Sequence, residues 1–141
     1  YLENRLARGE LELAGTRLDL GAVRTDVYVV GAEEDHIAPW MSTYKATQLL
    51  GGSTRFVLSS SGHIAGIVNP PSPKRTFWTN DAAPADPAAW REASERHAGS
   101  WWEDWVAWLS ERAGELGAPP SLGSEAYPPL GAAPGTYVLE Q

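Results

Sequence analysis

The sequence contains no cysteine, and this absence limits its chemistry. None of its 141 residues can form a disulfide, a thiolate metal site or a thiol nucleophile. Basic residues are also in the minority, because 11 Lys and Arg stand against 18 Asp and Glu and leave a formal net charge of -7. A chain with this balance lacks the positive surface that binds phosphate backbones or anionic lipids. We therefore expect neither a nucleic-acid partner nor a membrane-surface partner.

Long hydrophobic runs are absent as well. No apolar stretch reaches the roughly 20 residues that a membrane-spanning helix needs, and the residues from Tyr1 to Arg5 lack the basic-then-apolar order of a signal peptide. We expect no membrane span, and a cytoplasmic origin is compatible with the lack of cysteine. Hydrophobic residues still make up 43% of the chain, which is ordinary for a folded globular domain. Because the first residue is Tyr and not Met, we also expect a fragment of a longer protein.

The first sixty residues predict a hairpin followed by a strand–helix–strand unit. Residues 10–20 alternate apolar and polar side chains around a central Ala-Gly pair, which is the pattern of two short strands joined by a tight turn. Residues 26–31 form a continuous β-branched and aromatic run, which predicts an interior strand covered on both faces. Residues 39–50 predict a helix and residues 55–58 a second buried strand. The two strands of such a unit run parallel, so the loops that follow them lie together at one edge of the sheet.

The second half of the chain predicts one more strand, a long helix and a tail. Residues 74–78 can form the strand, and the pattern from Ala88 onward is helical. Three tryptophans at i, i+4 and i+7 of that helix are expected to pack into the core and to leave Trp102 exposed. They are Trp101, Trp105 and Trp108. Proline and glycine recur over residues 117–141, which predicts an extended tail that lies over the domain or is partly disordered.

One ionisable residue follows each of the two predicted parallel strands. His63 lies in a loop of sequence Ser-Gly-His-Ile-Ala-Gly, whose small residues let a substrate or a nucleophile approach, as a general base requires. Asp35 follows the earlier strand and could accept the imidazole N–H, which is the role of the third member of a catalytic triad. We therefore predict that Asp35 and His63 form a catalytic pair.

The sequence also leaves other roles open for these residues. A lone histidine in a loop is more often an exposed or hydrogen-bonding residue than a catalyst. His36 could contact a substrate, although a supporting hydrogen bond is the simpler role, and His97 is expected to be exposed on the helix. A metal site could use the acidic and imidazole groups of Glu33, Glu34, Asp35, His36 and His63. Their spacing matches no metal motif, so we assign no metal.

The chain offers no convincing nucleophile to complete a triad. The nearest approach to a Gly-x-Ser-x-Gly elbow is residues 51–55, which lack the second glycine and precede a strand instead of following one. In α/β-hydrolases the chain order is nucleophile, acid and then histidine. The missing residue is therefore expected upstream of Tyr1.

Five segments match one known protein family in the same order. Residues 27–40, Val-Tyr-Val-Val-Gly-Ala-Glu-Glu-Asp-His-Ile-Ala-Pro-Trp, are similar to its catalytic Asp segment, and residues 55–71 are similar to its catalytic His segment. Further similar stretches are residues 78–81, 99–105 and 133–138. The family that the chain resembles, over nearly its whole length, is the polyhydroxyalkanoate synthases. The Trp-rich and Pro-Gly-Thr-Tyr-Val endings look most like the single-subunit class I enzymes, which favour short-chain monomers.

This resemblance implies a fold, an activity and residue roles. The implied fold is the C-terminal part of an α/β-hydrolase-like catalytic domain over residues 1–116, with a mostly parallel sheet and flanking helices, incomplete without upstream residues. The implied activity polymerises (R)-3-hydroxyacyl-CoA, above all 3-hydroxybutyryl-CoA, onto a growing polyester with release of CoA and without a cofactor. Asp35, His63 and an upstream cysteine would form the triad, with Asp35 orienting His63 or activating the substrate hydroxyl. The implied setting is a cytoplasmic homodimer on the surface of polymer granules.

Two other functions stay open, and the chain alone is predicted to be inactive because its nucleophile is absent. Another α/β-hydrolase, such as an esterase or a polyester depolymerase, would share the Asp and His positions, because a fold does not fix a function. A non-catalytic granule-binding module would instead use the Trp-rich helix and the tail.

Overall fold

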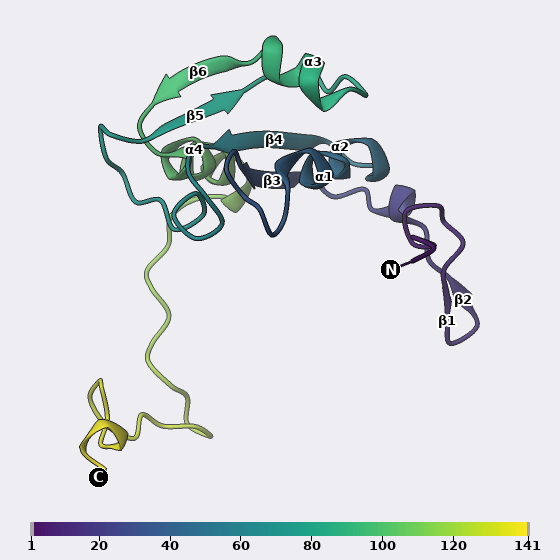
Figure 1. Cartoon of the computed structure of the whole chain (residues 1–141). Coiled ribbons are helices and arrows are strands. Elements are labelled where there is room, and N and C mark those ends of the chain that lie inside the picture. The colour runs from purple at the N-terminus through teal and green to yellow at the C-terminus, as the bar shows by residue number, and fades with distance from the viewer. Residues whose placement is uncertain (1, 141) are drawn as a thin grey trace.

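The structure, a computed structural model that describes residues 2–140, is built around a four-stranded sheet (Figure 1). In spatial order the strands are β3 (Val27–Ala32), β4 (Thr54–Ser59), β5 (Thr76–Thr79) and β6 (Glu95–Ala98). The α-helices are α1 (Trp40–Tyr44), α2 (Ala46–Leu49), α3 (Pro87–Glu92) and α4 (Trp101–Ala113). Two short 3-10 helices are η1 (Leu20–Ala22) and η2 (Tyr137–Leu139). The chain is therefore an α/β protein, as the sequence predicts.

The predicted hairpin is confirmed and stands apart from the main sheet (Figure 1). Strands β1 (Glu12–Leu13) and β2 (Thr16–Arg17) pair antiparallel. The two residues between them, Ala14 and Gly15, have φ values of 50° and 76°. Two consecutive positive φ angles are typical of the tight turns whose twist matches that of the strands they join.

The predicted strand–helix–strand unit is also confirmed. Strands β3 and β4 pair in parallel from Val27 opposite Thr54 to Ala32 opposite Ser59. The crossover between them contains α1 and α2, as parallel neighbours require. Successive strand residues face opposite sides of a sheet, and α1 covers the face of Val29, whereas α4 covers the face of Tyr28. Both faces of β3 are therefore covered, which explains its continuous apolar run.

Two expectations about the sheet are wrong for the described residues. The sheet is mixed and not mostly parallel, because β5 is antiparallel to β4 and β6 is antiparallel to β5. The chain returns from β4 to β5 through a loop without a crossover helix, and such a return reverses the strand direction. Strand β3 also lies at an edge of this sheet and not in its interior. Its apolar run reflects helices on both faces instead of strands on both sides.

The helical pattern from Ala88 onward is interrupted by a strand. Helix α3 ends at Glu92, and β6 then pairs with β5 before α4 begins. Gly99, with φ of 104°, turns the chain, and Ser100 starts α4 with a capping box in which its side chain and that of Glu103 bond each other's backbone N–H groups. Pairing with β5 thus overrides the helical propensity of this stretch.

The hydrophobic core lies on the Val29 face of the sheet, between the sheet and helices α1 and α3. Its buried members are Tyr44, Phe56, Leu58, Trp78 and Trp90. Three of them meet as a triangle of rings, because the centroid of Phe56 lies 5.0 Å from that of Tyr44 and 4.8 Å from that of Trp90. Edge-to-face packing of this kind stabilises a core beyond the area that it buries. None of the helices in residues 2–140 combines the length and apolar character that crossing a membrane requires.

Helix α4 is fixed to the opposite face of the sheet by a polar cluster. Asp104, in its first turns, accepts hydrogen bonds from the hydroxyl of Tyr28 (2.7 Å) and from the guanidinium of Arg55 (2.9 and 2.5 Å). Two tryptophans of the same helix pack around the Tyr28 ring. The helix therefore contacts both parallel strands at once.

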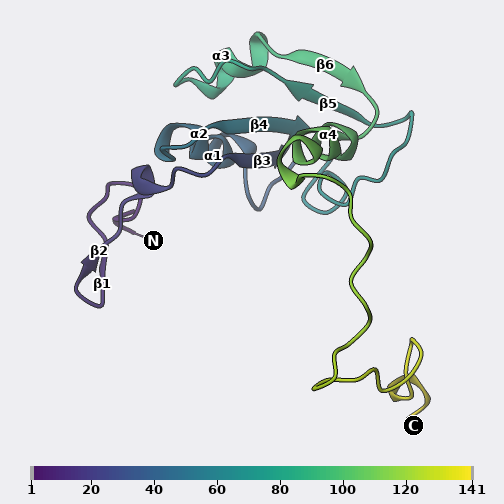
Figure 2. The same cartoon turned by 180° about the vertical axis from the view of Figure 1, so that it is seen from behind.

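The chain beyond α4 extends away from the sheet (Figure 2). Residues 114–140 are all exposed, and η2 is the regular element within this segment. The tail is extended, as the sequence predicts, and it does not lie over the sheet. The division into a domain of residues 1–116 and a tail of residues 117–141 stays a prediction.

Candidate active site

Two loops at one edge of the sheet carry the predicted pair. Because β3 and β4 are parallel and end in register, with Ala32 opposite Ser59, the chain leaves both strands at the same edge. Main-chain bonds continue beyond the strands, since the N–H of Glu33 donates to the carbonyl of Ser59 (2.8 Å) and that of Glu34 to the carbonyl of Ser61 (3.1 Å). Backbone hydrogen bonds thus hold the two loops side by side.

Asp35 and His63 meet across this edge. Nδ1 of His63 lies 2.9 Å from Oδ2 of Asp35. The Asp35 side chain exposes 6% of its surface, whereas the His63 side chain exposes 45%. The structure therefore brings together the two residues that the sequence pairs, with the carboxylate covered and the imidazole open to solvent.

Backbone donors keep Asp35 ionised. Its Oδ1 accepts the N–H groups of Ile37 (2.9 Å) and Ala38 (2.8 Å). The N–H of Ala38, followed by the hydrogen bond to His63 and the N–H of Ile37, lowers the pKa of Asp35 from 3.8 to about 2 against the opposing effect of desolvation. A carboxylate only accepts hydrogen bonds, so Nδ1 of His63 is the donor, and in the neutral imidazole Nε2 carries the lone pair. Because Nε2 forms no hydrogen bond within residues 2–140, it is free to accept a proton.

The His63 loop folds tightly against the end of β3. Ser61 has φ of 76°, in the left-handed region, and residues 62–68 form a helical turn in which the N–H of Gly66 donates to the carbonyl of Gly62 (2.8 Å). A Cβ at Gly66 would lie 2.5 Å from the Cβ of Ala32. No side chain fits there, so the glycine of the motif permits the close approach of the two loops.

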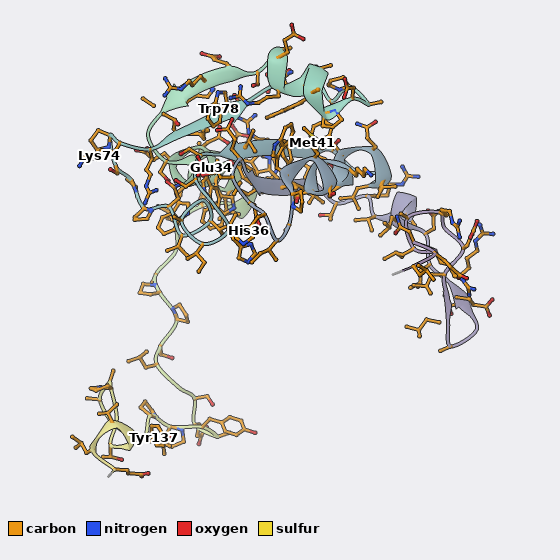
Figure 3. All side chains as sticks on the ribbon, in the orientation of Figure 1. Glu34, His36, Met41, Lys74, Trp78 and Tyr137 are labelled. Carbon is orange, nitrogen blue, oxygen red and sulfur yellow. The ribbon has the colours of Figure 1, made fainter. Side chains whose placement is uncertain are left out.

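The other candidate residues lie outside this contact. Glu33 forms an ion pair with Arg91 of α3 (3.0 Å). His36 is exposed and projects from the loop after β3 (Figure 3), so its role toward a substrate stays a prediction. Across residues 2–140, no group of three or more His, Asp and Glu side chains is arranged to hold a metal ion.

The predicted exposure of His97 on a helix is wrong. This residue lies in β6, where its ring stacks on Phe77 with centroids 4.9 Å apart. Its Nε2 is 2.7 Å from Oγ1 of Thr79 on the neighbouring strand. His97 therefore helps to join β5 and β6 and lies in a different part of the fold from the candidate site.

Sequence reasoning missed residues of α4 that contact the His63 loop. Trp102, expected to be exposed, donates its indole N–H to the carbonyl of Ile67 (3.1 Å), and Trp101 donates to the carbonyl of Gly66 (2.9 Å). Trp105, expected in the core, exposes 38% of its surface. Helical spacing shows which residues share a face, but it does not show which backbone carbonyls their indoles reach.

The described chain contains no partner nucleophile for this pair. Cysteine is absent from the sequence. Ser53, the residue at the centre of the imperfect elbow, precedes β4, whereas His63 follows it. A six-residue strand separates them by roughly 20 Å, because a strand rises about 3.3 Å per residue. Within the described residues, the candidate site therefore consists of His63 and Asp35.

Three curated proteins that are similar to this chain carry the same name, poly(3-hydroxyalkanoate) polymerase. Poly(3-hydroxyalkanoate) polymerase 1 of Ectopseudomonas oleovorans is 49% identical over 100% of this chain and 26% of its own length. The poly(3-hydroxyalkanoate) polymerase subunit PhaC of Cupriavidus necator is 46% identical over 98% of this chain and 24% of its own length. Poly(3-hydroxyalkanoate) polymerase 2 of Ectopseudomonas oleovorans is 50% identical over 92% of this chain and 23% of its own length.

The extent of these matches bears out the resemblance read from the residues. No protein-family model matches the chain. The chain spans about a quarter of the length of the curated relatives it matches, in their C-terminal part. Identity of 46% to 50% over at least 92% of the chain is found in all three relatives. The chain therefore belongs to the poly(3-hydroxyalkanoate) polymerase family.

Proposed function

We propose that this chain supplies the histidine and aspartate of a Cys-His-Asp triad in an enzyme that polymerises (R)-3-hydroxyacyl groups from CoA into polyhydroxyalkanoate. The observation that carries the proposal is the contact between Asp35 and His63, which leaves Nε2 of the imidazole free. The relatives are named as poly(3-hydroxyalkanoate) polymerases, which supports the reaction. The cysteine would come from outside the 141 residues, in an α/β-hydrolase-like domain. A parallel unit with Asp after one strand and His after the next supports that fold.

In the proposed reaction, Nε2 of His63 takes the proton from the cysteine thiol. The thiolate attacks the thioester carbonyl, the C–S bond to CoA breaks, and the imidazolium returns its proton to the departing CoA thiolate. This step leaves a 3-hydroxyacyl group on the cysteine. Transfer to the polymer then occurs when a 3-hydroxyl group, deprotonated by His63, attacks the acyl thioester of the cysteine. The new ester bond forms, the C–S bond to the cysteine breaks, and the imidazolium returns its proton to the cysteine thiolate. Each step moves a proton through the same nitrogen.

The surroundings of Asp35 favour an orienting role over direct activation of the substrate hydroxyl. Its Oδ2 contacts His63, and its Oδ1 accepts two backbone N–H groups. With 6% of its side chain exposed, the carboxylate has little surface to offer a substrate. A pKa of about 2 also makes it a weak base at neutral pH. Asp35 would thus fix the tautomer of His63 and stabilise the imidazolium.

The proposal extends to the setting of the enzyme. The full-length protein would act as a cytoplasmic homodimer at the surface of polymer granules, with short-chain monomers as preferred substrates. His36, exposed beside the pair, would contact the substrate or the growing polyester. Residues 1–116 would belong to the catalytic domain and residues 117–141 to a tail.

CoA release from (R)-3-hydroxybutyryl-CoA by the full-length protein tests the proposal. The parent protein is expected to release CoA, and its His63→Ala variant is expected to lose kcat by a factor on the order of 10³ or more, because the base of a triad is removed. His97→Ala is the matched control, since His97 lies on β6 and bonds Thr79 instead of Asp35. This variant should keep its activity, and the 141-residue chain alone should release no CoA.

Other results of this experiment would each change a different part of the proposal. An active parent with a nearly active His63→Ala variant would leave the family in place and remove His63 from the mechanism. A parent that hydrolyses simple esters but releases no CoA from short or longer 3-hydroxyacyl thioesters would instead be an esterase or a depolymerase. CoA release by the 141-residue chain would show that the nucleophile is not missing.

A further inference from the structure

Three consecutive residues at the start of α4 donate hydrogen bonds to carbonyls of the loop that carries His63. The three bonds run from Ser100 Oγ to the carbonyl of Asn69, from Trp101 Nε1 to that of Gly66 and from Trp102 Nε1 to that of Ile67. The two indole bonds measure 2.9 and 3.1 Å. One end of one helix therefore holds the loop at three points.

These carbonyls need partners from outside the loop. Residues 62–68 form a helical turn, with bonds from the N–H of Gly66 to the carbonyl of Gly62 and from that of Val68 to the carbonyl of Ile64. The last carbonyls of such a turn have no donor within it. Gly66 is buried, and a buried carbonyl without a partner is costly. The indole of Trp101 therefore satisfies a group that the loop itself cannot satisfy.

The donors are themselves held in place. Ser100 is fully buried and caps α4. Asn69, exposed by 1%, binds the loop internally, because its Nδ2 donates to Oγ of Ser59 (3.1 Å) and to the carbonyl of Ala65 (3.1 Å). The cluster at Asp104 fixes the following turn of α4 to the sheet. The start of α4 is thus a fixed platform under the His63 loop.

The imidazole of His63 has little else to position it. Its side chain is 45% exposed and its hydrogen bond within the described chain is the one to Asp35. A single bond fixes one nitrogen, whereas the direction of Nε2 also depends on where the backbone of the loop lies. Displacements of a fraction of an ångström at a catalytic group are enough to change a rate.

We propose that Trp101 and Trp102 are positioning residues for His63, acting through their indole N–H groups on the carbonyls of Gly66 and Ile67. The inference rests on the proposed function, in which Nε2 of His63 is the base. Neither tryptophan contacts the reacting atoms in this scheme. Their effect is to hold the loop backbone so that Nε2 points at the incoming thiol.

The test replaces one tryptophan at a time by phenylalanine in the full-length protein, which removes the indole N–H and keeps an aromatic ring. Trp101→Phe and Trp102→Phe are each expected to lower kcat for CoA release by about 3-fold to 10-fold, which is the effect of losing one net hydrogen bond. The KM should stay within about 2-fold, because the substrate keeps its contacts. Trp105→Phe is the matched control: Trp105 lies one turn along the same helix, packs edge-on against Trp101, and bonds no carbonyl within residues 2–140. It should leave kcat unchanged.

A second readout does not depend on turnover. In protein labelled with ¹⁵N at histidine, the Nδ1–H proton shared with Asp35 reports the geometry of the His63 ring. This resonance should shift or broaden in Trp101→Phe and Trp102→Phe and stay in place in Trp105→Phe. The inference would be overturned if Trp101→Phe and Trp102→Phe both left the resonance and kcat unchanged. An equal loss of kcat in Trp105→Phe would overturn it as well. If the parent does not act on 3-hydroxyacyl-CoA, the proposed function fails, while the resonance still decides the positioning role.

Discussion

Asp35 depends on main-chain donors more than on its imidazole partner. The largest influence that lowers its pKa is the N–H of Ala38, ahead of the hydrogen bond to His63 and the N–H of Ile37. Both backbone donors belong to the loop that follows β3, so the charge of Asp35 is a property of that loop. The carboxylate would therefore stay ionised through each protonation of the imidazole.

The titration of Asp35 tests this order of influences. In the 141-residue chain its carboxyl group should titrate at about 2, and in the His63→Ala variant the pKa should rise but stay below 3.8, because the Ala38 donor remains. Since the folded pKa is lowered, ionised Asp35 stabilises the fold above about pH 4, and this contribution is lost as the pH falls through about 2. Carboxyl ¹³C shifts followed from pH 1 to 6 measure it.

His97→Ala is the control for this titration, because it removes an imidazole that bonds Thr79 and not Asp35. It should leave the pKa of Asp35 at about 2. A return to 3.8 or above in His63→Ala would instead make the imidazole the dominant influence.

At the scale of a single element, helix α4 connects the sheet to the loop that carries His63. Its N-cap Ser100 and its first two residues, Trp101 and Trp102, hold the His63 loop. Asp104 binds Tyr28 of β3 and Arg55 of β4. Burial and the neighbouring Asp104 carboxylate raise the pKa of the Tyr28 hydroxyl well above its usual range. Against desolvation, the hydrogen bonds from Arg55 and Tyr28 lower the pKa of Asp104. Asp104 is therefore the ionised centre of the contact between helix and sheet.

Removal of this charge should loosen the helix. Asp104→Asn leaves Arg55 without its closest ion-pair partner. The Asp104 side chain is 18% exposed and that of Arg55 is 29% exposed. We therefore expect a loss of about 1 to 3 kcal/mol in the free energy of unfolding, which is less than for a fully buried pair. Urea denaturation of the variant measures it. Glu111→Gln on the same helix is the control, because Glu111 pairs with Arg112 at 75% exposure and should change stability by less than about 0.5 kcal/mol. Equal losses in both variants would contradict the role of Asp104.

Local sequence patterns predict the elements that are determined by residues close together in the chain. The Ala14-Gly15 turn has its own backbone signature, and the unit from Val27 to Ser59 combines two apolar runs with a crossover between them. The same unit placed Asp35 opposite His63, because parallel strands end at one edge. Both loops of the candidate site could therefore be placed from the sequence.

Elements that depend on distant partners were missed. Strand β6 exists through its pairing with β5, and its sequence Glu-Arg-His-Ala carries no strand signal. The edge position of β3 depends on which strands lie beside it, which an apolar run does not specify. The contacts of Trp101 and Trp102 with the loop likewise join residues 35 positions apart. Pairing partners and contacts over such separations are tertiary properties, so local periodicity does not encode them.

At the scale of the whole molecule, an ordered body meets an exposed C-terminal arm (Figure 2). In the sequence, the residues of the core and of the candidate site all fall between the start of β3 and the start of α4. Residues 114–140, which follow α4, are exposed throughout, so they contribute little buried area to the fold. Stability and the arrangement of the site therefore depend on the body alone.

Limited proteolysis with chymotrypsin distinguishes the two regions. Tyr137 is 81% exposed and Leu130 is fully exposed, whereas Tyr44 is 1% exposed in the core. Cleavage in the native 141-residue chain should therefore occur first after Leu130 and Tyr137, because a protease needs an accessible and extended backbone. Mass spectrometry of the early fragments identifies the sites. Early cleavage after Tyr44, or a tail as resistant as the body, would contradict this division.

The bonds that close the Asp35 loop onto the His63 loop join one peptide group to another. They run from the N–H of Glu33 to the carbonyl of Ser59 and from that of Glu34 to the carbonyl of Ser61. No side chain forms these bonds, and at the two donor positions proline is the residue that lacks the N–H they need. About half of the positions differ between this chain and each of the relatives that are 46% to 50% identical to it. Because main-chain groups form them, these two bonds do not depend on which side chains stand at positions 33 and 34, and the two loops can stay joined where those side chains differ.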